Sequence, residues 1–88
     1  MSEPWDSLYE SGGGSRWPDS YVVRWVMRHF SQAPDRRAIR IYDIGCGAGG
    51  ILRFLASEGF HAEGCDGSPA AVKAARQTLA LDGLDAYV

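Results

Sequence analysis

Apolar positions recur along the chain at two spacings, one typical of helices and one typical of strands. Helical spacing predicts a helix over residues 20–31. The apolar face of this helix consists of Val22, Val23, Val26, Met27 and Phe30. β-branched and aromatic residues predict a strand over residues 38–44, and a second short strand is predicted over residues 60–65.

Two further helices are predicted from apolar spacing and from residues that begin or end helices. Apolar residues follow the first strand at helical spacing from Ile51 to Ala56, and Gly59 is placed to end that helix. Ser68 is a good N-cap, and Pro69 suits the first helical position. We therefore expect the last helix to begin there and to end before Gly83.

The order of these elements predicts the fold class. Residues 84–88 resemble the start of a third strand, which completes a helix followed by three strands and two intervening helices. Strands that alternate with helices form parallel sheets with right-handed crossovers. We predict an α/β fold, a partial doubly wound (Rossmann-like) parallel sheet of about three strands with an amino-terminal helix before it. The chain divides into a leader, residues 1–18, and this partial ligand-binding domain, residues 19–88.

The leader combines aromatic residues with a run of glycines. Trp5, Tyr9 and Trp17 flank the segment Gly12–Gly14. Consecutive glycines are costly to order and are typical of loops. Two interpretations remain open: a flexible leader, or a lid whose aromatic side chains close over a ligand.

Composition excludes several classes of protein. The 88 residues, 45% hydrophobic and 23% charged, fit one small globular domain. No stretch approaches a membrane helix, and the start of the chain lacks the features of a signal peptide, so we expect a cytoplasmic protein without a membrane partner. A net charge of −2 argues against a nucleic-acid partner. Cys46 and Cys65 lack the spacing of zinc ligands, so we expect no metal.

The segment from Gly45 to Gly50 carries the candidate chemistry, because glycines between a strand and a helix let a ligand approach the backbone closely. The following helix start offers unpaired N–H groups to an anion. Asp66 ends the second strand, where a carboxylate can accept hydrogen bonds from two ribose hydroxyls. Together these features predict a nucleoside-containing ligand, with a purely structural turn as the alternative.

Two glycine patterns overlap in this segment. Gly45, Gly47 and Gly50 fit the G-x-G-x-x-G fingerprint of dinucleotide-binding proteins. Gly45, Gly47 and Gly49 instead continue a D-x-G-x-G-x-G pattern that begins at Asp43. A carboxylate at that position would repel a pyrophosphate but attract an ammonium and a sulfonium. Asp43 therefore favours the second pattern.

Two motifs resemble those of class I S-adenosylmethionine-dependent methyltransferases. Residues 41–49, IYDIGCGAG, are similar to the first motif of this family. Residues 64–69, GCDGSP, are similar to its second motif, an acidic residue followed by x-Ser-Pro and a helix. The resemblance implies that S-adenosylmethionine is the cofactor and that a methyl group passes to an acceptor the sequence does not identify. A non-catalytic nucleoside- or protein-binding fragment and, less favoured, a dinucleotide-dependent oxidoreductase fragment remain alternatives.

The resemblance also implies a role for each motif residue. Asp43 would contact the methionine part of the cofactor, directly or through water. Gly45, Gly47 and Gly49 would give its amino-acid end and ribose a close approach to the backbone. Asp66 would bind the ribose hydroxyls.

The remaining motif residues have alternatives of their own. Gly67 and Ser68 would lie beside the adenine, although helix capping alone is the better explanation of Ser68. Cys46, between two of the glycines, is better explained as a small packing residue of the cofactor site than as a nucleophile. We expect Cys65 to be buried in its strand.

The chain stops at Val88, within the expected third strand. The segments that carry the acceptor-binding residues of the family follow that strand, so no catalytic residue can be assigned. We expect an amino-terminal, cofactor-binding part that is catalytically incomplete, whether it is a fragment, a truncated gene product or a piece completed by a partner. The first strand would then have an open edge, which predicts self-association or a partner there.

Overall fold

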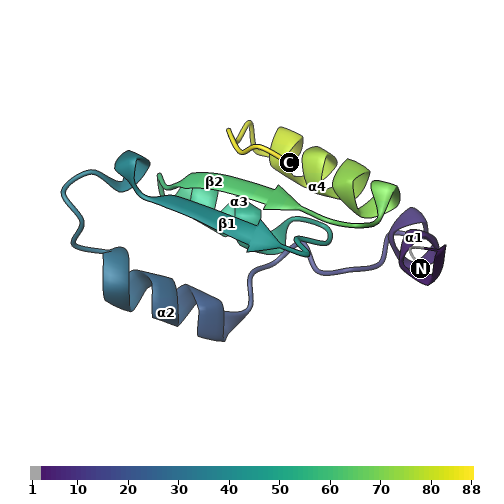
Figure 1. Cartoon of the computed structure of the whole chain (residues 1–88), viewed down its shortest axis with the longest axis horizontal. Helices are drawn as coiled ribbons and strands as arrows, with labels where there is room; N and C mark the ends of the chain where they lie inside the picture. The colour runs from purple at the N-terminus through teal and green to yellow at the C-terminus, as the bar shows by residue number, and fades with distance from the viewer. Residues whose placement is uncertain (1–2) are drawn as a thin grey trace.

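A small parallel sheet forms the centre of the computed structural model, which describes residues 3–88 (Figure 1). Strands β1 (Arg40–Ile44) and β2 (His61–Cys65) pair in parallel along their whole length. Tyr87 extends the sheet by a single parallel bridge to Glu63 on β2. The order is therefore carboxyl-terminal segment, β2, β1, as expected for one half of a doubly wound sheet.

Helices precede and connect these strands. They are α1 (Glu3–Glu10), α2 (Ser20–Phe30), the short 3₁₀ helix η1 (Arg36–Ala38), α3 (Gly50–Ser57) and α4 (Pro69–Leu81). The β1–α3–β2–α4 alternation confirms the predicted α/β fold class.

The predicted helix boundaries are confirmed within a residue or two. The Asp19 carboxylate caps α2 by accepting a hydrogen bond of 2.8 Å from the Tyr21 amide. The Ser68 hydroxyl caps α4 by accepting one of 3.2 Å from the Ala71 amide. Gly59 follows the end of α3 with a φ of +90°, the left-handed conformation that commonly ends helices.

Three segments differ from the sequence-based expectation. The leader contains helix α1, which no apolar spacing indicated because the helix is mostly solvent-exposed. The predicted strand over 38–44 begins only at Arg40, because Asp35 caps the 3₁₀ turn η1 and accepts from the Arg37 amide. The third strand is reduced to its one bridge at Tyr87.

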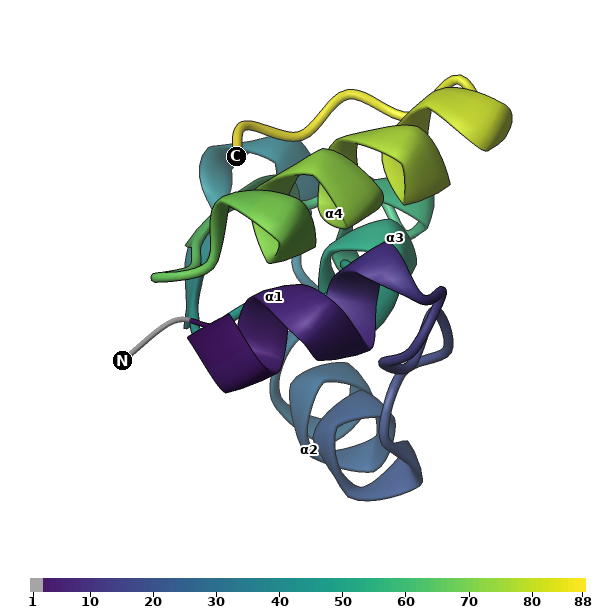
Figure 2. The same ribbon diagram turned by 90° about the vertical axis from the view of Figure 1, so that its right-hand side faces the viewer.

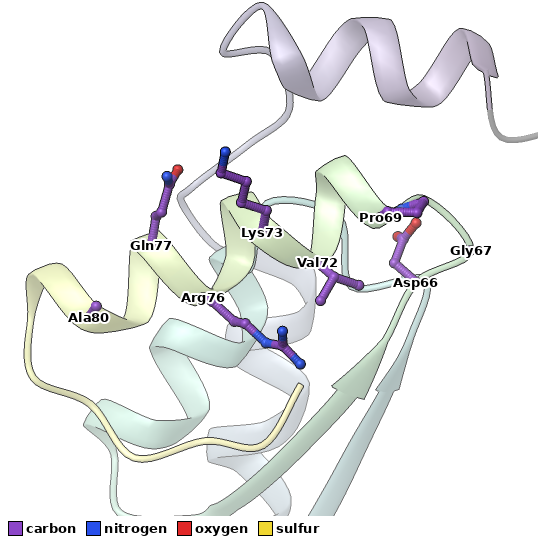
Figure 3. A pocket seen from close by; sticks show the side chains of 8 residues that line it. All are labelled: Asp66, Gly67, Pro69, Val72, Lys73, Arg76, Gln77 and Ala80. Atoms are coloured by element: carbon purple, nitrogen blue, oxygen red, sulfur yellow. The ribbon is translucent and has the colours of Figure 1, made fainter.

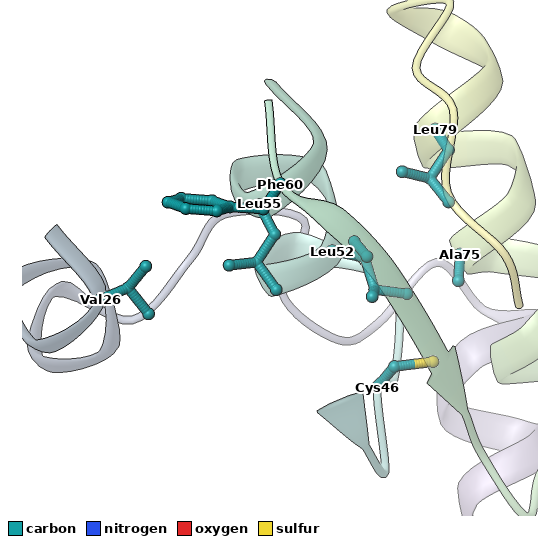
Figure 4. Close-up of a cluster of buried hydrophobic side chains, with 8 residues drawn as sticks. Val26, Cys46, Leu52, Leu55, Phe60, Ala75 and Leu79 are labelled. Atoms are coloured by element: carbon teal, nitrogen blue, oxygen red, sulfur yellow. The ribbon is translucent and has the colours of Figure 1, made fainter. Parts of the chain in front are cut away.

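The hydrophobic core lies between the sheet and the helices that connect its strands (Figure 4). Leu52 and Leu55 of α3 and Phe60 before β2 are completely buried. Val26 of α2 and Leu79 of α4 close the cluster from either side. The opposite face of the sheet is open, since Tyr42 is 56% and Ile44 is 80% exposed. None of the helices over residues 3–88 has the length and apolar character needed to span a bilayer.

Replacing Leu55 by alanine tests the core. Loss of this completely buried side chain should lower the free energy of unfolding by about 2–5 kcal/mol, because a cavity remains in α3's contact with the sheet. Leu81→Ala is the matched control, because Leu81 is 81% exposed and should change stability by less than about 0.5 kcal/mol. Urea denaturation followed by circular dichroism measures both, and equal effects would contradict the assigned core.

Candidate functional site

The glycine segment crosses from the carboxyl end of β1 over the end of β2. The Gly45 and Cys46 amides both donate to the Cys65 carbonyl oxygen, at 2.8 and 2.9 Å. These two bonds join the ends of the strands and turn the chain toward α3. The loop therefore lies where ligands bind in open α/β sheets, outside the carboxyl ends of the strands.

At two of its positions a positive φ coincides with a close neighbour, which favours glycine. Gly47 has a φ of +54°, and a Cβ there would lie 2.7 Å from the Tyr9 hydroxyl. Gly49 has a φ of +88°, and a Cβ there would lie 3.1 Å from Cα of Ala75 on α4. Glycine at position 47 leaves room for the Tyr9 hydroxyl beside the backbone. Glycine at position 49 lets the start of α3 pack directly on α4.

Asp66, the residue after β2, holds the loop in place. One carboxylate oxygen accepts a hydrogen bond of 2.9 Å from the Gly47 amide, and the other accepts one of 2.9 Å from the Ser68 amide. Because each carboxylate oxygen has two lone pairs, both can still accept a hydrogen bond from a ligand. The single side chain thereby links the glycine loop, the end of β2 and the start of α4.

Asp43 on β1 supplies a second carboxylate near the first. Its side chain is half-buried and makes no hydrogen bond to any described residue. Burial raises the pKa of this carboxyl, and the negative charge of Asp66 raises it further. An unpaired, half-buried carboxylate beside another is electrostatically unsatisfied, so a cation placed between them would be stabilised.

Cys46 is packed beneath the loop. Its side chain is buried in the core cluster with Leu52 and Ala62. Burial raises the pKa of the thiol to about 11, with Asp43 and Asp66 contributing in the same direction. A thiol that stays protonated at neutral pH is a poor nucleophile, which agrees with the predicted packing role.

Helix α1 lies across this end of the molecule, beside the start of α4 (Figures 1 and 2). The Asp6 carboxylate accepts hydrogen bonds from the Ser68 hydroxyl and, at 3.4 Å, from the Ala70 amide. A carboxylate at the amino terminus of α4 is favoured by the helix dipole. The Tyr9 side chain then reaches Gly47, and burial together with the nearby Asp66 carboxylate raises the pKa of its hydroxyl.

Two cavities lie in this region, one lined by the loop and one lined by Asp66. One, of about 330 Å³, lies between the leader and the start of α3, with Tyr9, Trp17 and Asp19 on one side and Gly47 and Ile51 on the other.

The second cavity, of about 560 Å³, is more open and begins at Asp66 and Gly67 (Figure 3). It runs along α4 past Lys73 and Arg76, whose guanidinium donates to the Val88 carbonyl oxygen at 2.7 Å. The loop therefore lines the cavity on the leader side, and Asp66 lines the cavity along α4.

The structure gathers most of the predicted site residues at one end of the sheet. Those at the carboxyl ends of the strands are Asp43, Gly45, Cys46, Gly47, Gly49, Asp66 and Gly67. Ser68 is separated from solvent, only 2% exposed, because α1 covers it. The expectation that Cys65 is buried is wrong: it is an exposed free cysteine on the open face of the sheet.

Sequence reasoning missed two residues of this region. Nothing in the sequence singles out Asp6, because its contact with Ser68 spans 62 positions. Tyr9 was noted only as one of the aromatic residues of a lid. The structure places its hydroxyl against the glycine loop. The only signal in the sequence was a tyrosine within a glycine-rich leader, which does not predict this contact.

Comparison with known proteins agrees with this geometry. A family model described as "Methyltransferase domain" matches residues 41–88. A ribosomal RNA small subunit methyltransferase C from Alcanivorax borkumensis is 41% identical over 49 residues, which are 56% of this chain and 15% of that protein. A solved structure from work on "Conversion of a Disulfide Bond into a Thioacetal Group during Echinomycin Biosynthesis" superposes with a TM-score of 0.78 at 28% identity. It aligns with 99% of this chain, which spans 37% of that one.

The fold thus defines an α/β protein of the doubly wound type. The family match includes both the glycine loop and Asp66 and extends over more than half of the chain. The chain therefore belongs to the class I S-adenosylmethionine-dependent methyltransferase family.

The two cysteines should differ in reactivity toward iodoacetamide at pH 8. A thiol with a pKa of about 11 is ionised to about one part in a thousand at this pH, and Cys46 is also buried. We expect Cys65 to be alkylated at least about tenfold faster. Trypsin places them on separate peptides, residues 41–53 and 54–73, so mass spectrometry follows each directly.

Cys65→Ser serves as the control and should abolish the fast reaction. Rapid modification of Cys46 in the folded protein would contradict its packing role.

Proposed function

We propose that this chain binds S-adenosylmethionine at the glycine loop and forms the cofactor-binding part of a methyltransferase. The observation that carries the proposal is the pair of carboxylates around the loop. Asp66 is fixed by two backbone amides with acceptor capacity to spare, and Asp43 is half-buried without a partner. The first suits ribose hydroxyls, and the second suits a positively charged group.

The residues present fit this cofactor at each end. The hydroxyls of a ribose beside Asp66 could donate hydrogen bonds to the two remaining acceptor positions of the carboxylate. The ammonium and sulfonium of the methionine part would relieve the repulsion between Asp43 and Asp66. A pyrophosphate would increase that repulsion, which disfavours a nicotinamide or flavin dinucleotide at the same loop.

The cofactor supplies the methyl group as a cationic sulfonium, and the residues of this chain contribute binding and orientation. Methyl transfer requires an acceptor nucleophile aligned with the sulfonium methyl, so positioning accounts for much of the catalysis. Asp43, Gly47 and Asp66 would fix the donor in that alignment. The methyl acceptor stays unassigned, since the similar proteins differ in what their names describe: ribosomal RNA in one and a disulfide in the other.

Helix α1 would act as the lid over this site. The Asp6 contact with Ser68 fixes the helix on α4, and Tyr9 then lies against the part of the loop that the cofactor approaches. The cavity on the leader side, lined by Tyr9, Asp19 and Gly47, would receive the methionine end of the ligand. We infer that Tyr9 moves or becomes a wall of the site when the cofactor binds.

Asp66→Ala should weaken binding of S-adenosylmethionine by about tenfold to a hundredfold, because hydrogen bonds to a charged acceptor contribute about 1.5–3 kcal/mol. Isothermal titration calorimetry of the full chain measures the change. Asp85→Ala is the matched control, since its side chain is 89% exposed on the carboxyl-terminal segment. Binding of NAD in place of S-adenosylmethionine would overturn the proposal.

The affinity should also fall with decreasing pH. Asp43 must be ionised to attract the ammonium, and its pKa in the folded protein is raised above 3.8. Binding should therefore be complete above this raised pKa and weaken as the pH falls through it. The same shift means that protonation of Asp43 favours the folded state, so the loss of binding would reflect the lost charge of this carboxylate and not unfolding caused by its protonation.

Calorimetric titration with S-adenosylmethionine at pH values between 4 and 7 measures this effect, and the Asp43→Asn variant provides the comparison. The variant should bind more weakly and show a flatter pH profile. An unchanged profile would remove Asp43 from the binding site.

A further inference from the structure

Helix α2 divides into two faces of different chemistry. One face packs on the core through Val26, which is 4% exposed, and through Val22 and Phe30. The outward face presents aromatic and basic side chains at helical spacing, namely Tyr21, Arg24, Trp25, Arg28 and His29. We call these five residues the α2 face.

The α2 face concentrates positive charge on a chain whose net charge is −2. Arg24 and Arg28 are exposed, one helical turn apart, and neither has an ion pair or hydrogen bond within the described part of the chain. By contrast, four other arginines are paired with carboxylates: Arg36, Arg37, Arg40 and Arg53. The face itself contains no acidic residue, so its two charges are uncompensated.

The same face exposes flat aromatic surface. Tyr21 is 67% exposed and Trp25 is 48% exposed. The ring of Trp25 stacks on that of His29 with centroids 4.3 Å apart and planes inclined by 25°. The His29 ring is held in this position by a hydrogen bond of 2.8 Å between its Nδ1 and the Trp25 carbonyl oxygen.

We propose that the α2 face binds single-stranded RNA. Unstacked bases can stack on Tyr21 and on the Trp25–His29 pair, while Arg24 and Arg28 contact the phosphates. An acidic protein would satisfy the arginines but leave the rings without stacking partners. A membrane surface needs an apolar helix face to insert, and the apolar face of α2 is already packed against the core.

The position of α2 connects this surface with the glycine loop. The helix begins at Ser20, immediately after Asp19, which lines the cavity on the leader side. Figures 1 and 2 show α2 and α4 on opposite sides of the molecule, and no residue of α2 lines the cavity along α4. Binding of RNA to this face rests on α2 alone and is independent of the proposed cofactor.

Fluorescence anisotropy with a labelled 12-nucleotide single-stranded RNA tests the proposal on the full chain without added cofactor. The double variant Arg24→Gln/Arg28→Gln should weaken binding at least about tenfold in 50 mM salt and reduce the salt dependence, d log K/d log[salt], by about 1.4 in magnitude. Trp25→Ala should weaken binding by about fivefold or more, because it removes the stacking surface.

Arg37→Gln/Arg40→Gln is the matched control. It removes the same charge from exposed positions outside α2 and should leave the affinity within about twofold. Circular dichroism verifies that every variant keeps its helices.

Each of four results would overturn the proposal. These are wild-type binding weaker than about 100 µM in 50 mM salt, equal losses in the two double variants, equal displacement of RNA by polyglutamate at matched charge, and tighter binding of DNA of the same sequence. Failure of RNA binding leaves the S-adenosylmethionine titration unaffected, so the two proposals are tested separately.

Discussion

The hydrogen bonds of Asp66 are the constraint on which this end of the molecule depends. Its two carboxylate oxygens hold the glycine loop on one side and the first residues of α4 on the other. Without them, the amides of Gly47 and Ser68 would lose their charged acceptor in a partly buried setting. The residue proposed to bind the ribose therefore also builds the surface that the ribose would approach, so its structural and binding roles share one side chain.

An unpaired carboxylate distinguishes the proposed ligand-binding end of the sheet from the rest of the surface. Elsewhere, carboxylates such as Glu58 and Asp82 are paired with arginines. Asp43 has no such partner among the described residues, and its neighbour Asp66 carries the same charge. This arrangement lowers the stability of the folded protein at neutral pH, and the same negative charge creates a place that attracts a cation.

The sequence predicted those parts of the fold that are determined by local signals. Asp19, Gly59 and Ser68 act within a few residues of themselves, so the helix ends were predictable. The position of Asp66 at the ligand end of the sheet followed from the general rule that ligands bind outside the carboxyl ends of parallel strands. Helix α1 and the Asp6 contact were not predictable, because they depend on tertiary packing between distant segments. Exposure of Cys65 was missed because the far face of the sheet is uncovered, a feature that alternation along a strand does not reveal.

The contact between Asp6 and Ser68 has a consequence for the order of folding. During synthesis α1 is made before α4, and the Ser68 that Asp6 contacts follows 62 residues later. Contacts of such sequence separation form only after a long loop has closed, which favours their formation after local contacts. The glycine loop and Asp66 can therefore assemble before the leader is in place, and Tyr9 would be the last of these groups to reach its position.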